Sequence, residues 1–242
     1  MEINLSKLDH LRFGIITAKA KIDGADSVDE LISEFKILNA ELAIIRLPTQ
    51  CIQLAQDLEK AGAILTDTLV YYQRKKIALF EINLPTEYLA CFATSDDAAK
   101  VEAIALESFK GYSGHYHADT RLCKEDCDAV YSSWAKNSCT QENLADEVLL
   151  IKCNEEIAAF ATLKKINTID YEGILFGVAP DHQGKGLYLN LMQLSCNWGM
   201  KNNMRRLLTS TQITNITVQK NWSRIGMEPL NSFYTFHLWM NK

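Results

Sequence analysis

The segment from Glu172 to Tyr188 constrains the fold of this chain more than any other. Its apolar half, GILFGVAP, ends at Pro180 and is typical of a strand, and the polar turn DHQGKG follows it. A strand that leads through glycines into a helix leaves backbone N–H groups unpaired, and the helix dipole adds positive charge there. The turn is therefore predicted to bind an anion such as a phosphate. The apolar residues after the turn recur at helical spacing, at Leu187, Leu191, Leu194 and Trp198.

Two common phosphate-binding motifs do not fit this turn. A Walker A loop requires Ser or Thr after its Gly-Lys pair, whereas Gly186 follows Lys185. A dinucleotide fingerprint requires a third glycine at the position that Leu189 occupies. The pattern that remains is V-x-P-x-x-Q-G-x-G-L, starting at Val178. A strand–turn–helix connection without any ligand is the alternative interpretation.

A second patterned segment follows the strand-like residues Arg206–Thr209. It reads NITVQKNWSRIGM and begins at Asn215, a residue suited to the start of a helix. Gly226 suits the left-handed position that ends a helix. We therefore predict a helix between these two residues. Its apolar face carries Val218, Trp222 and Ile225.

Together these two segments resemble the GNAT superfamily of N-acetyltransferases, and the resemblance covers roughly residues 90 to 240. The first looks like the coenzyme A pyrophosphate loop and the second like the family's next helix. The resemblance implies an α/β fold with a mixed, mostly antiparallel central sheet flanked by helices. It also implies acetyl-CoA as the cofactor. The implied contacts are Phe176, Gly177, Val178, Gln183, Gly184, Lys185, Gly186, Leu187, Tyr188, Asn215 and Trp222.

The chemistry of amide formation from a thioester suggests catalytic residues. Backbone N–H groups near Phe176 and Val178 are candidates for polarising the thioester carbonyl. Candidate bases for the acceptor amine are His117, His237 and Glu172.

Trp222 stands where many family members have a tyrosine that protonates the departing sulfur. An indole N–H only donates hydrogen bonds and does not ionise, so Trp222 does not take that role. Tyr234, Tyr188 or a water molecule could supply the proton, and the thiolate could also leave unassisted. A protein that no longer catalyses is a further alternative.

The loop from Gly111 to Arg121 is rich in polar rings. In GNAT proteins the loop between the first two helices commonly borders the acceptor pocket, which implies acceptor contacts here. A polar surface loop is the alternative, and no metal is expected because the two histidines lack further ligands at suitable spacing. The predicted acceptor residues are His115, Tyr116, His117, Asp119 and Arg121.

A narrower resemblance is to the TDP-fucosamine N-acetyltransferases, which acetylate the amine of a TDP-linked 4-amino-4,6-dideoxyhexose. Arg12, Arg121 and Arg224 weakly favour such an anionic acceptor. A polyamine, an aminoglycoside and a protein N-terminus are alternative acceptors, and a coenzyme A-binding sensor without turnover is the alternative class. The residues that carry this resemblance are Leu8-Asp9, Arg12-Phe13-Gly14, His115–Asp119, Tyr131-x-x-Trp134 and Asn137-Ser138.

The remainder of the chain predicts two domains, with a boundary near Pro85. Residues 1–85 are expected to form an α/β accessory domain and residues 86–242 the GNAT domain. In the first domain we expect a strand over Leu11–Ile22 and a helix opened by a Ser27–Glu30 capping box. A second helix with Ile52, Ala55 and Leu58 facing inward and one or two strands over Ala63–Ile82 follow. No internal repeat is visible.

Composition narrows the class of partner. The net charge of −5 without a basic tract argues against nucleic-acid binding. No run of eighteen apolar residues and no secretory signal are present, so we expect a cytoplasmic protein without a membrane partner. Seven scattered cysteines favour free thiols over a disulfide framework. The expected partner is a small-molecule amine, and a homodimer stays open.

Overall fold

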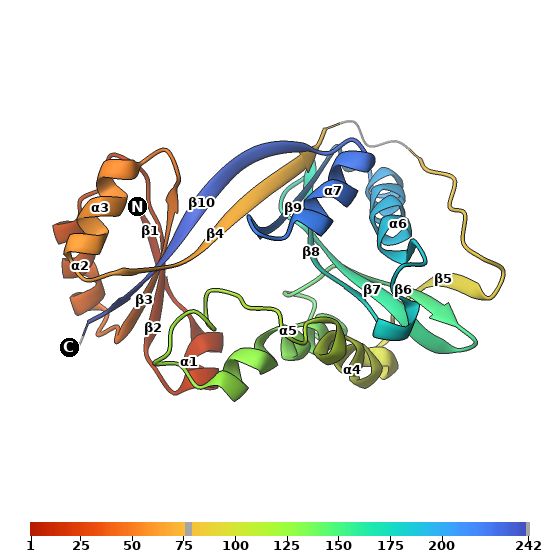
Figure 1. The fold of residues 1–242 in the computed structure, drawn as a ribbon, viewed down its shortest axis with the longest axis horizontal. Coiled ribbons are helices and arrows are strands. Elements are labelled where there is room, and N and C mark those ends of the chain that lie inside the picture. Colours follow the sequence, from red (N-terminus) through yellow and green to blue (C-terminus); the bar gives the residue numbers. More distant parts are fainter. Residues whose placement is uncertain (76–78, 241–242) are drawn as a thin grey trace.

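One mixed β-sheet connects the two ends of the protein in the computed structural model, which describes residues 1–75 and 79–240 (Figure 1). The strand order is β1-β2-β3-β10-β4-β9-β8-β7-β6-β5. Only β2–β3 and β8–β9 pair in parallel within this described part, and the other neighbours are antiparallel. The strands are β1 Glu2–Leu5, β2 Thr17–Lys21, β3 Leu42–Pro48, β4 Ile64–Arg74, β5 Tyr88–Phe92, β6 Glu147–Cys153, β7 Glu156–Lys165, β8 Asp170–Val178, β9 Arg206–Gln212 and β10 Glu228–Trp239.

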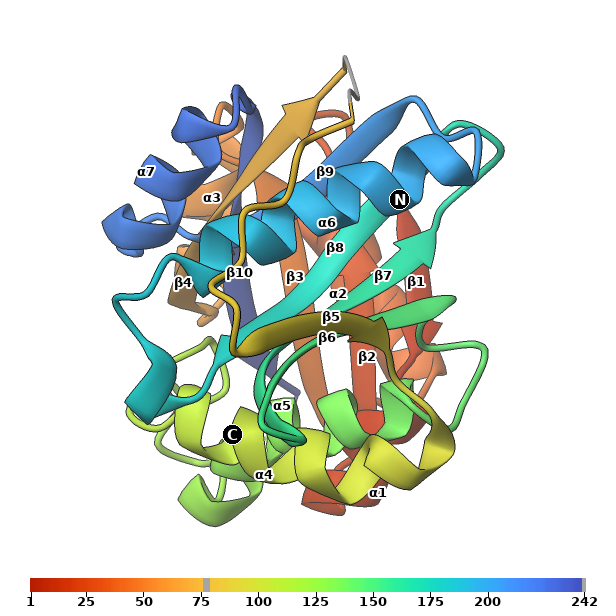
Figure 2. The same cartoon turned by 90° about the vertical axis from the view of Figure 1, so that its right-hand side faces the viewer.

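Helices cover both faces of the sheet (Figure 2). In β6, Leu149 and Ile151 face α6, whereas Val148 and Leu150 face α4 and α5, as the two-residue period of a strand requires. All four residues are buried, so this strand reads as a continuous apolar run. The helices are α1 Lys7–Phe13, α2 Val28–Ile37, α3 Ile52–Lys60, α4 Ala98–Ser108, α5 Lys124–Ser138, α6 Leu187–Lys201 and α7 Ile216–Arg224, with short 3₁₀ turns at Ser95–Asp97 and Pro180–His182.

The topology contains an internal repeat that the sequence does not show. Each half has an antiparallel pair, then a parallel pair joined by a helix, then a second helix and a long strand. In the first half these are β1, β2, α2, β3, α3 and β4, and in the second β7, β8, α6, β9, α7 and β10. The long strands are exchanged: β4 pairs with β9, and β10 pairs with β3 (Figure 1). The two halves therefore share one sheet, and the predicted division near Pro85 remains a prediction.

Several expectations for the first half need correction. The strand expected over Leu11–Ile22 is confined to β2, because Ser6 caps α1 with its side chain and Gly14, at φ 67°, ends that helix. Neither α1 nor β1 was predicted, since both are too short to show a period. Ser27 does begin α2, but its side chain makes no capping hydrogen bond.

The second helix and the strand after it also differ in detail from the expectation. Ile52 is 50% exposed, and the buried face of α3 is Leu54, Ala55 and Leu58. A single strand, β4, occupies the first part of the stretch from Ala63 to Ile82, and residues 76–78 of that stretch lie outside the described part of the chain.

The two parallel strands on either side of the predicted phosphate turn and α6, which are β8 and β9, form a fork. They pair only from Asp170–Gly173 to Arg206–Thr209, and beyond this point each strand follows its other neighbour. A register shift between Thr162 and Leu163 of β7 marks a bulge beside the point of divergence, and bulges bend strands. At the closed end, Arg206 donates to both carboxylate oxygens of Asp170, at 2.8 Å from Nε and 2.6 Å from the guanidinium NH₂.

The Asp170→Asn variant tests this closed end of the fork. Removing a charge-assisted, two-point interaction is expected to lower the free energy of unfolding by about 1–2 kcal/mol. The bond to Arg206 lowers the pKa of Asp170 below 3.8, so its stabilisation is present above that pH and is lost as the pH falls below it. Urea denaturation at pH 7 and pH 3 measures both effects. The exposed Asp181→Asn change is the matched control, and equal stability of the two variants at pH 7 would contradict the assignment.

Candidate active site

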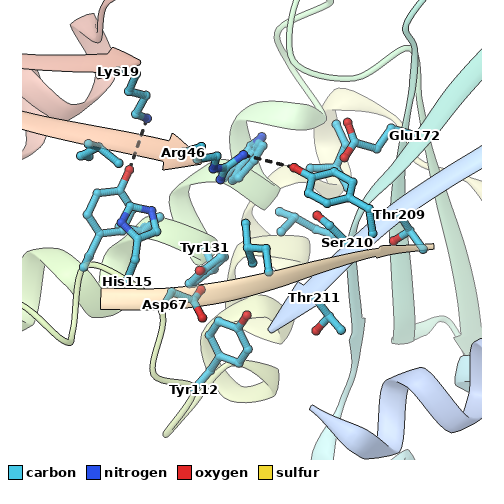
Figure 3. Close-up of a pocket in the computed structure, with 18 of the residues that line it drawn as sticks. Lys19, Arg46, Asp67, Tyr112, His115, Tyr131, Glu172, Thr209, Ser210 and Thr211 are labelled. Atoms are coloured by element: carbon cyan, nitrogen blue, oxygen red, sulfur yellow. Dashed lines mark hydrogen bonds between the residues drawn. The ribbon is translucent and has the colours of Figure 1, made fainter. Parts of the chain in front are cut away.

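A cavity of about 710 Å³ lies between the open end of the fork and the first half of the chain. Strands β2, β3, β4, β8 and β9, helices α1 and α5 and the loop before α5 all contribute to its walls. Figure 3 shows Lys19 and His115 at one end of it and Glu172 with Thr209 at the other. The cavity is therefore elongated, with the strand fork at one end only.

The predicted phosphate turn has free backbone donors. Gly184 and Gly186 have φ of 75° and 78°, a conformation that glycine adopts at no steric cost. The Gln183 side chain turns back and donates to the Val178 carbonyl at 3.3 Å, which fixes the turn against the end of β8. Within the described residues, the backbone N–H groups of residues 184–189 donate to no acceptor. The turn thus presents a group of amides at the start of α6, as the anion-site prediction requires.

The equivalent turn of the first half carries carboxylates that contact its own amides. It lies between β2 and α2, and two of its backbone N–H groups donate to these carboxylates. Asp23 N donates to Asp26 Oδ2 and Ala25 N donates to Asp23 Oδ1, both at 2.9 Å. The two carboxylates also make the turn negative. The turn of the first repeat is therefore a poorer anion site than the turn of the second.

The edge of β8 that faces the fork carries two further amides. Ala179 N donates to Ala158 O on β7, and strand alternation directs the N–H of Gly177 to β7 as well. The N–H groups of Phe176 and Val178 therefore point away from β7, toward the open fork. This is the orientation that the sequence prediction requires of an oxyanion donor.

Trp222, which is buried, and Tyr188, which is half-buried, form a hydrogen-bonded pair on the wall of the cavity. Trp222 is 1% exposed, and its indole N–H donates to the Tyr188 hydroxyl at 3.0 Å. Burial raises the pKa of Tyr188 well above its ordinary value, and the bond from Trp222 offsets this only in part. Asn215 caps α7 by accepting from Val218 N at 3.3 Å, and it also lines the cavity.

Two carboxylates face the cavity from opposite sides. Glu172 lies on β8 just before the strands diverge, and Asp67 lies on β4 (Figure 3). Burial raises the pKa of Glu172 above 4.5, and Arg46, Lys164 and Lys21 reduce the increase. Burial likewise raises the pKa of Asp67 above 3.8. Both groups are therefore better proton acceptors than an exposed carboxylate.

The acceptor loop places two of its five predicted residues in the cavity, His115 and Tyr116. The Tyr116 hydroxyl donates to Asp9 Oδ1 at 2.8 Å and accepts from Lys19 Nζ at 3.3 Å. Consecutive tight turns direct the other three residues away from the cavity. His117 bonds Asp128 at 3.0 Å outside the cavity.

Asp119 and Arg121 lie behind the wall rather than on it. Asp119 is 2% exposed and accepts from Trp239 Nε1 at 2.8 Å. The Arg121 guanidinium stacks 4.6 Å from the Trp239 ring centre and donates to Asp119 at 3.1 Å. The expectation of direct acceptor contacts is therefore not supported for these two residues.

The two catalytic candidates on the last strand also lie off the cavity. Tyr234 packs with the apolar core under α2 and α3, on the other face of the sheet. His237 is 0% exposed and bonds two other buried side chains. Of the arginines considered above, only Arg12 lines the cavity, since Arg224 bonds Asn221 on the exposed side of α7.

The structure adds residues that the sequence did not single out, all of them on strands of the first half or in the loop region. Arg46 donates to the Tyr71 hydroxyl at 3.2 Å across the cavity (Figure 3). Strand residues such as these carry no motif, and only the exchange of β4 and β10 between the two halves brings them to the fork. The additional lining residues are Lys19, Lys21, Arg46, Asp67, Tyr71 and Tyr112.

Comparisons with known proteins agree with this geometry. Residues 113–227 match the model of the Acetyltransferase (GNAT) family. A GCN5-related N-acetyltransferase from Sphaerobacter thermophilus has a TM-score of 0.61 at 13% identity, over 88% of this chain and 66% of that one. A glucosamine N-acetyltransferase region of a fungal β-N-acetylglucosaminidase has a TM-score of 0.58 at 13% identity, over 87% of this chain and 27% of that one.

One curated relative is similar in sequence. The spore coat polysaccharide biosynthesis protein SpsD of Bacillus subtilis is 22% identical over 148 residues, which are 60% of this chain and 49% of that protein. The match thus spans about half the length of the curated relative. None of the helices in the described ranges is both long and apolar enough to cross a membrane.

The fold is the GNAT fold, α/β with a mixed, mostly antiparallel sheet flanked by helices. The family model that matches residues 113–227 is that of the GNAT acetyltransferases, a family of acyltransferases that normally use acetyl-CoA. The matched region contains the predicted phosphate turn, the fork and Trp222, and the first half of the chain supplies the remaining walls of the cavity.

Gly186→Val tests the turn as the cofactor anchor. A β-branched residue at φ 78° is strained by about 1–2 kcal/mol or more, so the turn changes shape and acetyl-CoA affinity falls about tenfold or further. Isothermal titration calorimetry with acetyl-CoA measures the effect. Lys185→Ala is the control and is expected to change affinity little, because the proposed contacts come from backbone amides. If the Gly186→Val variant bound acetyl-CoA with unchanged affinity, the turn would not be part of the cofactor site.

Proposed function

We propose that this protein transfers the acetyl group of acetyl-CoA to the primary amine of an amino sugar. The specific acceptor proposed is the 4-amino group of a TDP-linked 4-amino-4,6-dideoxyhexose. One observation carries the proposal: the fork between β8 and β9 opens into a long cavity whose far end is built by the first half of the chain. A thioester held in the fork would meet an acceptor that fills this cavity.

The backbone of the second half would hold the cofactor. The free amides of residues 184–189 suit the pyrophosphate, and the Phe176 and Val178 amides suit the thioester carbonyl. Fixed donors aimed at a developing oxyanion typically supply several kcal/mol of transition-state stabilisation. Both tasks use main-chain N–H groups, so they depend on the path of the chain more than on side chains.

Glu172 is the proposed base for the acceptor amine. It lies where the fork closes, and its raised pKa makes it a better proton acceptor than an exposed glutamate. It takes one proton from the ammonium form, and the neutral amine then attacks the thioester carbon. As the carbon–sulfur bond breaks, the nitrogen loses one further proton, which balances the proton that Tyr188 gives to sulfur. His117 and His237, the other bases suggested by the sequence, do not line the cavity.

Tyr188 is the proposed proton donor to the departing sulfur. The Trp222 indole N–H occupies one acceptor position of the Tyr188 oxygen, so the hydroxyl proton is free to point elsewhere. Its raised pKa keeps it protonated until the thiolate forms. In this arrangement Trp222 positions a tyrosine from the neighbouring helix instead of supplying a hydroxyl itself.

The acceptor end supports a charged, sugar-like ligand. Four cationic residues of the first half line it, Arg12, Lys19, Lys21 and Arg46, beside the carboxylates Glu2, Asp9 and Asp67. Lys19 pairs with Asp9 at 2.6 Å, and the other three cations have no carboxylate partner among the described residues. Residues of every short motif that resembles the TDP-fucosamine enzymes also line the same cavity, although they are far apart in the sequence. The names of two relatives, a polysaccharide biosynthesis protein and a glucosamine N-acetyltransferase region, agree with an amino-sugar acceptor.

Tyr188→Phe separates the two tyrosines that the sequence offers as proton donors. Loss of the donor is expected to lower kcat by about 10²-fold, the lower end of general-acid effects, because a thiolate is already a good leaving group. The acetyl-CoA KM is expected to change little. Tyr234→Phe is the comparison and is expected to keep full kcat, since Tyr234 packs on the other face of the sheet. The reverse pattern would assign the role to Tyr234.

Thiol release from acetyl-CoA with a panel of amines tests the reaction itself. We expect release with a TDP-4-amino-4,6-dideoxyhexose and little with spermidine, an aminoglycoside or a peptide N-terminus. Turnover with a polyamine alone would show that the acceptor is a polyamine and not an amino sugar. Acetyl-CoA binding without release on any amine would instead favour a cofactor-binding sensor.

A further inference from the structure

Three side chains from distant parts of the sequence form a buried chain that ends at the cavity. His237 Nδ1 lies 2.9 Å from Asp119 Oδ2, and His237 Nε2 lies 2.9 Å from His115 Nδ1. The exposed fractions are 2% for Asp119, 0% for His237 and 9% for His115. Only His115 lines the cavity. The acetyl-transfer mechanism proposed above uses none of these three groups.

The carboxylate at the inner end of the chain is ionised. Burial raises its pKa, but hydrogen bonds from His237, Trp239 and Arg121 outweigh burial and hold the pKa of Asp119 well below its usual range. An ionised carboxylate only accepts hydrogen bonds. His237 Nδ1 must therefore carry the hydrogen that it shares with Asp119.

This constraint fixes the hydrogens along the chain once the His237 ring is taken as neutral. A neutral ring with its hydrogen on Nδ1 has a lone pair on Nε2, so His237 then accepts from His115 Nδ1. Burial, then the neighbouring His237, Arg46 and Lys19, lower the pKa of His115, which keeps that ring neutral. His115 Nε2 is then left with a lone pair. Within the described part of the chain, no side chain or backbone group donates to it.

We infer that His115 Nε2 is a fixed hydrogen-bond acceptor in the cavity wall and selects acceptors that place an N–H or O–H donor against it. Asp119 and His237 are positioning residues that hold His115 in this tautomer. The inference depends on the proposed function in one respect: it assumes that the ligand in the cavity is the acceptor substrate.

The neighbours of His115 define the ligand chemistry further. Lys19 and Arg46 lie on the same wall and offer N–H donors and positive charge (Figure 3). The complementary ligand group is one N–H or O–H donor flanked by oxygen acceptors. A pyrimidine-2,4-dione edge has this pattern, and so does a sugar hydroxyl beside a phosphate. Cytosine does not, because its ring nitrogen would direct a lone pair at His115 Nε2.

A metal site does not account for the same three residues. They are arranged end to end, with each shared hydrogen bond using the ring nitrogen that a metal would need. Across residues 1–75 and 79–240, no group of three His, Cys, Asp or Glu side chains converges in a way that could hold a metal ion.

Nitrogen NMR of the ¹⁵N-histidine-labelled protein measures the tautomer directly. At pH 7.5 we expect His115 protonated on Nδ1 and unprotonated on Nε2, and His237 in the same form. The resonances are assigned by their disappearance from the spectra of the His115→Phe and His237→Gln variants. A hydrogen on His115 Nε2 in the free protein would overturn the inference.

Steady-state kinetics measures what the lone pair does for the substrate. His115→Phe is expected to raise the acceptor KM at least tenfold and to leave the acetyl-CoA KM unchanged. His10→Phe, at an exposed position on α1, is the matched control and should leave both values unchanged. An unchanged acceptor KM in His115→Phe would overturn the inference.

Two substitutions at His237 separate positioning from packing. In His237→Gln, the amide oxygen can still accept from His115 Nδ1, so the acceptor KM should stay within a few-fold of the wild-type value. His237→Leu removes the acceptor and should raise that KM toward the His115→Phe value. Thermal melts of both variants report folding. Equal KM values for two folded variants would contradict the positioning role.

Titration with nucleoside diphosphates identifies the source of the donor and does not require turnover. If the donor is an imide, TDP binds the wild type at least tenfold more tightly than N3-methyl-TDP or CDP, and His115→Phe removes this preference. If the donor is a sugar hydroxyl, the three nucleotides bind alike, and the His115 Nε2 resonance moves only with the full nucleotide sugar. No movement of that resonance with either ligand overturns the inference. The proposed reaction could still hold in that case, since thiol release is measured separately.

Discussion

The divergence of two parallel strands is the constraint on which the rest of this molecule depends. β8 and β9 share hydrogen bonds over only four residue pairs and then follow different neighbours. Unpaired amides appear on the inner edge of β8, and the turn after β8 presents more amides at the start of α6. Backbone polar groups that lose a partner need another one, and here a ligand can supply it. The Asp170–Arg206 pair closes the fork at the other end.

The exchanged strands determine what the fork opens onto. Because β4 and β10 each cross into the opposite half, the first half lies beside the second in one sheet rather than as a separate body. In its equivalent turn, Asp23 and Asp26 accept from two of the backbone amides and add negative charge. Its strands instead contribute cationic and aromatic side chains to the second half's cavity. Two copies of one topology thus have different roles.

Burial explains why hydrogen-bond partners matter more than charge in this cavity. His115 is buried and Glu172 and Tyr188 are half-buried, and burial shifts the pKa of each toward its neutral form. Each is then defined by its neighbour: Trp222 orients the Tyr188 hydroxyl, and the chain from Asp119 through His237 sets the tautomer of His115. The oriented Tyr188 and His115 side chains therefore suit the recognition of uncharged polar groups.

The sequence alone determined the local elements with strong chemical signatures. The glycines at 184 and 186, the Asn215 cap and Gly226 predicted the turn, the second helix and its end, because positive φ and capping are properties of single residues. Only the tertiary structure decided which side chains meet. Tight turns direct His117 and Arg121 away from the cavity. The pairing of β10 places Tyr234 on the face of the sheet that packs against α2 and α3, away from the cavity. Crossing strands brought Lys19 and Arg46 into the cavity, since pairing across long separations leaves no local pattern in the sequence.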